Sequence, residues 1–151
     1  MKNPWYVTGL ADGEGCFSIS FNFRKKLNCG IEVRPSFSIT LNKREIISLK
    51  EIREYFKVGG IRFSKKDQCY KYEVRSIKEI YKNIIPHFEK YPLNTSKDKD
   101  FKIFKRLCFL IYANQHLSKN VLIKIIQEAY KMNSSGKRKI PKEKLLKQLA
   151  R

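Results

Sequence analysis

The sequence lacks a long apolar run. Crossing a bilayer takes about 18 or more apolar residues in a row, whereas the apolar residues of this 151-residue chain come in short, interrupted stretches. The chain begins MKNPW, which does not resemble the apolar segment of a secretory leader. We therefore expect an intracellular protein without a membrane partner, in a bacterial or archaeal cytoplasm or in an organelle.

Cysteine and histidine are also scarce, and neither is spaced for metal binding. The two histidines, His87 and His116, have no ligand partner at a metal-binding distance along the chain. The cysteines are scattered: Cys16, Cys29, Cys69 and Cys108. These patterns predict reduced thiols and structural histidines, and they argue against a zinc site or a disulfide framework.

Acidic residues are the third shortage. The chain has 33 Lys and Arg against 14 Asp and Glu, so its formal net charge is +19. A field of that strength favours a polyanionic partner, and nucleic acid is the commonest one. Because 42% of the residues are hydrophobic and 13% are aromatic, the chain can also bury the core of one ordinary domain.

Two alternating runs follow a short first helix. Asn3 and Pro4 are typical of a helix start, and this helix is predicted to end at Gly13 or Gly15. In GCFSISFNF the apolar and polar residues alternate, which indicates a strand with one apolar and one polar face. The second run, IEVRPSFSITL, is interrupted by Pro35, which predicts a bulge or an edge position there.

Helices and strands continue to alternate along the chain. Helical spacing over residues 43–56 is followed by two short strands, IRFSKK and YKYEVRS, and by a helix that Ser76 starts and Pro86 stops. Two longer helices, over residues 98–114 and 118–132, precede a basic linker and a short last helix. This order predicts an α+β fold of the αββαββα type, with helices packed on one face of an antiparallel sheet.

The polar faces of the predicted strands carry hydroxyl, amide and basic side chains. A β-ribbon fits the major groove of DNA, where short polar side chains read base edges and Arg or Lys reach guanine or phosphate. A solvated sheet face would show the same alternation, but the net charge of +19 favours a DNA-binding face. The predicted DNA-binding residues are Ser18, Ser20, Asn22, Arg24, Arg34, Ser36, Ser38, Thr40, Arg62, Ser64, Lys66, Lys71, Glu73 and Arg75.

The stretch VTGLADGEG places two acids, Asp12 and Glu14, where the first helix ends. That end is the negative pole of the helix dipole, so the placement is mildly unfavourable unless something nearby compensates. Gly9 and Gly13 lie four residues apart on one face of the helix, which lets a second helix approach closely. The alternative is that these glycines pack against the chain's own core.

VTGLADGEG resembles the signature helix of the LAGLIDADG homing endonucleases, in which a small-residue helix with acids near its end leads into a strand. FSITLNKREI and IIPHFEKYPLNTSK also resemble segments of that family, so the likeness covers roughly residues 4–100. Val7 and Thr8 depart from the Leu and Ala of the family name, and Glu14 replaces the commoner Asp but keeps the carboxylate. The derived element order is also the family's, with a saddle-shaped sheet.

The resemblance implies a sequence-specific homing endonuclease that cuts both strands of DNA. Members of the family use two motif helices, and this chain has one, so a homodimer with a pseudo-palindromic target is implied. The endonuclease domain would span residues 1–133, and a basic linker with a short helix would follow over residues 134–151. The implied dimer-interface residues are Tyr6, Gly9, Leu10 and Gly13.

The resemblance also implies a divalent cation at the end of the motif helix. Carboxylate and carbonyl oxygens suit Mg²⁺, with Mn²⁺ or Ca²⁺ able to substitute for binding. Glu14 is the expected first ligand and catalytic acid, the Gly13 carbonyl is the second, and Asp12 has a weaker claim. The bound cation would then compensate the acids at the helix end.

Two more catalytic residues follow from the resemblance. Such sites usually include a cation that stabilises the developing charge. Lys97 matches that position best, with Lys99 as the alternative. Asn42, late in the second strand, is the candidate for positioning water.

Three other functions remain open from the sequence. One is an RNA-binding maturase that kept the fold and promotes splicing of an intron RNA. Another is a non-catalytic DNA-binding regulator on the same fold, which would have no need of Glu14. A small ribosome-associated RNA binder would share the charge, but it would not need a glycine-faced helix that ends in acids.

The charge excess gives a first prediction. If about six to ten phosphates are contacted, affinity for nucleic acid should fall about a thousandfold or more between about 50 and 200 mM salt. A fluorescence-anisotropy titration of duplex DNA at several salt concentrations measures this slope. A flat salt response would contradict a nucleic-acid partner.

Overall fold

The computed structural model describes residues 3–133 and 138–151. The predicted basic linker falls largely on residues 134–137, which lie outside the described residues. None of the helices in the described part of the chain is long and apolar enough to span a membrane. The elements are α1 (Pro4–Glu14), β1 (Gly15–Phe23), β2 (Ile31–Asn42), η1 (Lys43–Glu45), α2 (Ile46–Phe56), β3 (Gly60–Ser64), β4 (Cys69–Val74), α3 (Ile77–Glu79), η2 (Ile80–Ile84), α4 (Ile85–Lys90), α5 (Lys97–Tyr112), η3 (Gln115–Leu117), α6 (Lys119–Ala129) and α7 (Lys142–Leu149).

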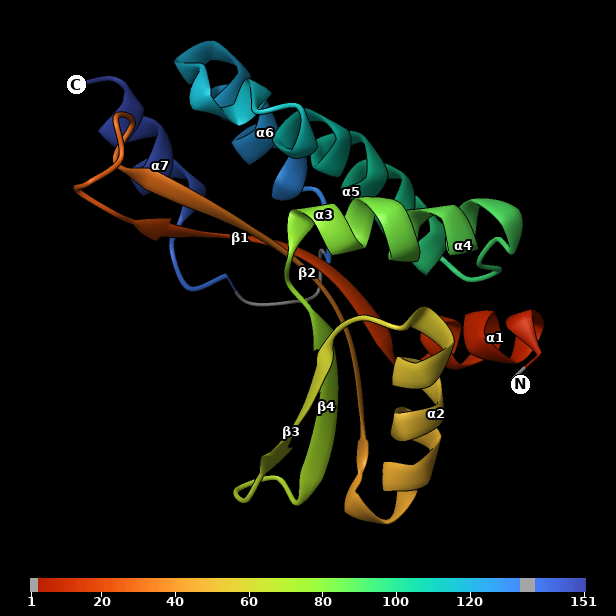
Figure 1. Ribbon diagram of the computed structural model, residues 1–151. Coiled ribbons are helices and arrows are strands. Elements are labelled where there is room, and N and C mark those ends of the chain that lie inside the picture. The colour runs from red at the N-terminus through yellow and green to blue at the C-terminus, as the bar shows by residue number, and fades with distance from the viewer. Residues whose placement is uncertain (1–2, 134–137) are drawn as a thin grey trace.

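The strands form one antiparallel sheet in the order β1-β2-β4-β3. Figure 1 shows the sheet strongly curved, with α1, α2, α4 and α5 on the same side of it. This arrangement confirms the predicted α+β fold and its αββαββα order. The hairpins between β1 and β2 and between β3 and β4 lie at opposite ends of the sheet (Figure 1).

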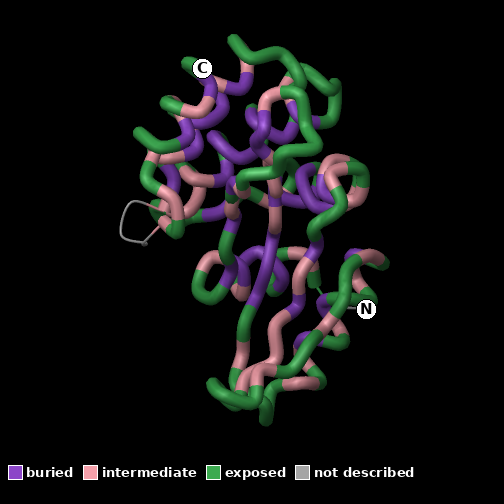
Figure 2. The backbone as a smooth tube through the Cα atoms, turned by 90° about the vertical axis from the view of Figure 1, so that its left-hand side faces the viewer, coloured by how far each residue is buried: buried purple, intermediate pink, exposed green. Residues whose placement is uncertain are grey.

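The alternation in β1 places every second side chain in the core. Phe17, Ile19 and Phe21 are buried, whereas Cys16 and Ser20 are exposed. The ring of Phe17 lies 5.1 Å from that of Phe37 on β2 and 5.3 Å from that of Phe104 on α5, measured between centroids. Figure 2 shows buried residues running through the strands and helices, and exposed residues in the turn between β3 and β4.

Pro35 occupies an edge position within β2. The register of β1 against β2 runs without interruption through the Ile19–Pro35 pair, so no bulge forms. On its other side β2 pairs with β4 only from Phe37 to Asn42. Pro35 therefore lies where β2 has a single neighbour, which suits a residue without an amide hydrogen.

The prediction that a helix stops at Pro86 is wrong. The chain continues from α3 through the π-helical turn η2 into α4, which runs to Lys90. Pro86 lies in the first turn of α4, directly after this π-helical turn. The wider turn just before it lets the helical path continue despite the proline ring.

A buried hydrogen-bond network fixes the core-facing side of α1. The Thr8 hydroxyl donates to the carbonyl of Tyr91 at 2.8 Å, so it accepts the bond that joins it to His87 Nε2 at 3.0 Å. His87 Nε2 is therefore the protonated nitrogen, and Nδ1 accepts from the Tyr55 hydroxyl at 2.9 Å. The network connects α1, α2 and α4 through a neutral imidazole, and it confirms the structural role expected of His87.

The neutral state of His87 predicts acid sensitivity. Burial lowers the pKa of His87 to about 4. Between its ordinary pKa of about 6.5 and that value the unfolded chain binds a proton that the folded chain does not, so stability falls as pH falls. Between pH 7 and 5 this loss should be about 2 kcal/mol, measured as a lower urea midpoint.

Burial also lowers the pKa of His116, so His116→Gln serves as the background for this measurement. In that background, replacing His87 with Gln should lower stability at pH 7 and flatten the dependence on pH. An unchanged pH dependence after His87→Gln would contradict the assignment.

Candidate active site and nucleic-acid interface

Most of the predicted DNA-binding residues lie on one polar face of the sheet. The strand register sets Ser18 opposite Ser36 and Ser20 opposite Arg34. Most of them line one hollow on that face, together with two residues that were not predicted, Cys16 and Pro35. The predicted residues in this hollow are Ser18, Ser20, Arg34, Ser36, Ser38, Arg62, Lys71, Glu73 and Arg75.

Cys16 is the residue on this face that the sequence pattern could have revealed. It begins the same every-second-residue series as Ser18 and Ser20, and it is exposed. Among the predicted residues, Ser38 faces the hollow but is only 7% exposed. Lys66 lies in the turn between β3 and β4, and Thr40 and Ser64 lie near that end of the sheet, outside the hollow.

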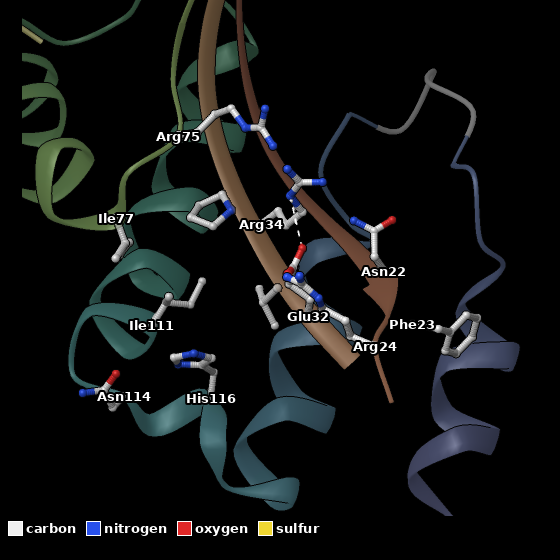
Figure 3. A pocket seen from close by; sticks show the side chains of 12 residues that line it. Asn22, Phe23, Arg24, Glu32, Arg34, Arg75, Ile77, Ile111, Asn114 and His116 are labelled. Atoms are coloured by element: carbon white, nitrogen blue, oxygen red, sulfur yellow. Dashed lines mark hydrogen bonds and ion pairs between the residues drawn. The ribbon is translucent and has the colours of Figure 1, made fainter. Parts of the chain in front are cut away.

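A second hollow adjoins the first just beyond the end of β4. Arg34 and Arg75 line both, so the two hollows form one connected surface. Figure 3 shows that basic side chains from just after β1, from β2 and from just after β4 gather here, with His116 on the opposite wall. The residues that line it are Asn22, Phe23, Arg24, Glu32, Val33, Arg34, Pro35, Arg75, Ile77, Ile111, Asn114 and His116.

The helix α1 is followed directly by β1, and the chain turns tightly at Gly15. A Cβ atom on Gly15 would lie 2.6 Å from the Ala11 carbonyl oxygen, so the turn requires glycine. The preceding residues, Gly13 and Glu14, are exposed at the end of the helix. The Glu14 carboxylate makes no hydrogen bond or ion pair within the described part of the chain, which leaves its oxygens available to a ligand.

The Asp12 carboxylate is hydrogen-bonded to the loop before α5. Its Oδ2 accepts from the Asn94 amide at 2.7 Å, and its Oδ1 accepts from the Thr95 amide and hydroxyl at 3.1 and 2.7 Å. Partial burial raises the pKa of Asp12, but these bonds and the charge of Lys97 outweigh it, so the pKa lies below its usual value. Protein donors thus engage both oxygens, and the surroundings of Asp12 do not support the predicted role as a metal ligand.

Lys97 compensates the negative end of α1. Its ammonium group donates to the carbonyl oxygens of Ala11 and Asp12, each at 3.0 Å. Those carbonyls are among the last of the helix, where a cation is favoured. Lys97 rather than Lys99 therefore lies beside the acids of the motif, and it supplies the compensation that the sequence alone assigned to a bound metal.

Asn42 is the last residue of β2. It lies three residues beyond Ile39, the β2 residue that pairs with Gly15. Its side chain accepts from the Arg44 amide at 3.1 Å and caps η1. The predicted role of Asn42 in positioning water stays a prediction.

The glycines of α1 face open space. A Cβ atom added at Gly9 or Gly13 would meet no atom of the described chain within 4 Å. Trp5, on the first turn of the same helix, is 53% exposed. The alternative that these glycines pack against the chain's own core is therefore wrong, and this face of α1 is free to meet another surface.

The comparisons identify the family. The family model described as LAGLIDADG endonuclease matches residues 7–108, so the chain belongs to that family. A protein of Neurospora crassa named probable intron-encoded endonuclease 2 is 33% identical over 132 residues, which cover 87% of this chain and 29% of that protein. The chain thus spans well under half of this relative.

Solved structures show the same fold. The homing endonuclease I-TnaI superposes with a TM-score of 0.86 at 34% identity, over 99% of this chain and 97% of that one. The meganuclease I-CpaMI, solved bound to uncleaved DNA, gives a TM-score of 0.88 at 35% identity, over 98% of this chain and 49% of that one. Both the family and the fold predicted from the sequence are confirmed.

The contacts of Asp12 generate a stability prediction. Asp12→Asn keeps the shape but turns an amide group toward backbone donors, and it removes the charge that faces Lys97. We expect a loss of about 1–2 kcal/mol in the free energy of unfolding, measured by urea denaturation. Thr95→Val removes one of the three bonds and should cost less, and an equal or larger loss in that variant would contradict the assignment.

Proposed function

We propose that the chain is a sequence-specific DNA endonuclease that works as a homodimer, requires Mg²⁺ and cuts both strands of a long pseudo-palindromic site. The observation that carries the proposal is the free, exposed Glu14 carboxylate at the end of a helix whose glycine face is open. The connected polar and basic hollows of the sheet begin at the strand that follows this helix.

The open face of α1 supports a dimer of identical chains. Glycines at 9 and 13 let a second helix approach closely, and a two-fold pair presents the same face from both copies. The two copies of α1 would then meet along Tyr6, Gly9, Leu10 and Gly13, and each would deliver one Glu14. The overlap with I-TnaI, over 97% of that chain, supports comparing this chain with one chain of that endonuclease.

The donor set at the end of α1 fits a hard divalent cation. In the described part of the chain no three His, Cys, Asp or Glu residues are grouped to hold a metal, so one copy offers Glu14 and the Gly13 carbonyl. A second copy and the DNA phosphates would complete the ligands, all of them oxygen, as Mg²⁺ prefers. When bound, the cation would lower the pKa of a water and neutralise charge on the phosphate.

In this proposal the residues around the cation have separate tasks. Glu14 would hold it, and the tight turn at Gly15 ties the helix end that carries Glu14 to β1. Lys97, anchored on the Ala11 and Asp12 carbonyls, places a positive charge beside the same corner. The hollows of the sheet hold the duplex on either side, and the name of the Neurospora crassa relative supports an intron as the location of the gene.

A cleavage selection tests the proposal. The protein is incubated with Mg²⁺ and a randomised duplex library, and the ends of the cut molecules are sequenced. We expect double-strand cuts at one pseudo-palindromic sequence. Glu14→Gln should lower the cleavage rate by about a hundredfold or more while leaving binding of the same site intact.

The charge-matched control is Glu89→Gln. Glu89 forms an ion pair with Lys105 between α4 and α5, away from the sheet face, so this variant should cut at the parent rate. Cutting by Glu14→Gln at the parent rate would overturn the catalytic assignment. Specific binding without cutting by the parent would favour the regulator or the maturase, and an asymmetric cleaved site would contradict the homodimer.

A further inference from the structure

Two acidic side chains, Glu32 and Glu73, lie on the face that the proposed function assigns to DNA. Both belong to polar positions of the sheet, and each lines one of the two hollows. A carboxylate there repels phosphate and subtracts from the field that attracts DNA. In a chain with a net charge of +19, these two acids work against affinity, so their contacts should show what they provide instead.

Glu73 is surrounded by polar and basic side chains from three strands. Its Oε2 accepts from the Ser36 hydroxyl at 3.2 Å and lies 3.4 Å from the Lys71 ammonium group. Its Oε1 lies 3.7 Å from the Arg62 guanidinium on β3. The side chain of Glu73 is 15% exposed, whereas those of Arg62 and Lys71 are 64% and 34% exposed. The acid thus lies beneath the groups that it holds.

Glu32 repeats this arrangement farther along β2. Its carboxylate pairs with the Arg24 guanidinium and, at 3.3 Å, with Nε of Arg34. The Glu32 side chain is 22% exposed, whereas those of Arg24 and Arg34 are 61% and 42% exposed. Figure 3 shows both arginines beside Glu32, with a dashed line marking the ion pair between Arg34 and Glu32.

The benefit of such contacts is restraint of long side chains. A free Arg or Lys has many rotamers, and a mobile cation can neutralise whichever phosphate is nearest, on any sequence. A guanidinium that is already held in one orientation can pair with a guanine edge at a smaller entropic cost, and it reaches fewer alternative phosphates. A carboxylate beneath the basic groups therefore lowers the affinity for DNA of any sequence and increases the discrimination between target and non-target DNA.

We propose that Glu73 and Glu32 are specificity-determining residues, which restrain the neighbouring basic and hydroxyl side chains and thereby weaken binding to non-target DNA. The inference rests on the proposed function, because it concerns how the same sheet face selects its site. Neither acid is assigned a base of its own, and each acts through the groups that it holds.

The two acids should influence different parts of the target. Glu73 pairs across the sheet with Ser38, close to the end of α1 that would lie at the centre of the site. Glu32 lies six residues from Ser38 along β2, which is about 20 Å of strand. Glu73 should therefore affect positions near the centre of each half-site, and Glu32 positions several base pairs farther out.

The test compares binding selections on a randomised duplex library, with Ca²⁺ as the divalent cation so that bound DNA stays intact. The parent, Glu73→Gln, Glu32→Gln and the charge-matched control Glu89→Gln are selected in parallel. Dissociation constants are then measured for the selected duplex and for a scrambled duplex of the same composition. Salt slopes are recorded for both duplexes.

We expect both variants to bind scrambled DNA more tightly, by about fivefold to tenfold at about 100 mM salt, because each frees cations for about one more phosphate. The ratio of selected to scrambled affinity should fall about tenfold or more, with several inner positions relaxed for Glu73→Gln and outer positions for Glu32→Gln. Glu89→Gln should keep the parent ratio.

Four results would overturn the inference. An unchanged affinity ratio in both variants would show that the acids do not set specificity, and equal weakening on both duplexes would show that they only support the fold. Relaxation at one cytosine position alone would show that the acid itself reads a base. A parent that binds all duplexes equally would refute the proposed function as well, which separates the two failures.

Discussion

The corner at which α1 passes into β1 is the constraint on which the rest of this structure depends. Gly15 lies so close to the Ala11 carbonyl that no side chain fits, so helix and strand meet without a connecting loop. Asp12 binds the segment before α5, and Lys97 binds the carbonyls of the helix end. These contacts give Glu14 a fixed place at the edge of the sheet, which a flexible loop could not provide.

The two sides of α1 differ in their contacts. On the buried side, the Thr8 hydroxyl is hydrogen-bonded to His87 on α4, and His87 is hydrogen-bonded to Tyr55 on α2. These bonds connect α1 to α2 and α4. On the opposite side, a Cβ atom at Gly9 or Gly13 would meet no atom of the described part of the chain within 4 Å. A helix anchored on one side and open on the other is suited to meet a second copy without losing its orientation, because the anchoring contacts lie away from the interface.

Acidic and basic side chains on the sheet are arranged in ion pairs. The excess of Lys and Arg supplies a general attraction for a polyanion, yet the described basic side chains around Glu32 and Glu73 are held in defined ion pairs. Single exposed ion pairs contribute little to stability. Here the ion pairs matter because they orient the basic side chains that line the hollows.

The sequence by itself determined the pattern of the fold and the membership of the family. Period-two alternation in β1 and β2 follows from side chains that point to opposite faces, and it located the polar face correctly. The stretch VTGLADGEG located the helix and its acidic end. Pro35 indicated an edge position, because the missing amide hydrogen limits where a proline fits in a sheet.

Only the tertiary structure decided what the individual polar residues do. Asp12 finds its donors 82 and 83 residues away, and Thr8 meets His87 79 residues away, so no local pattern reveals these bonds. The helix runs past Pro86 because a π-helical turn precedes it, and the side chain of Asn42 caps η1. Local periodicity fixes which face a side chain occupies, but its partner depends on how distant elements pack together.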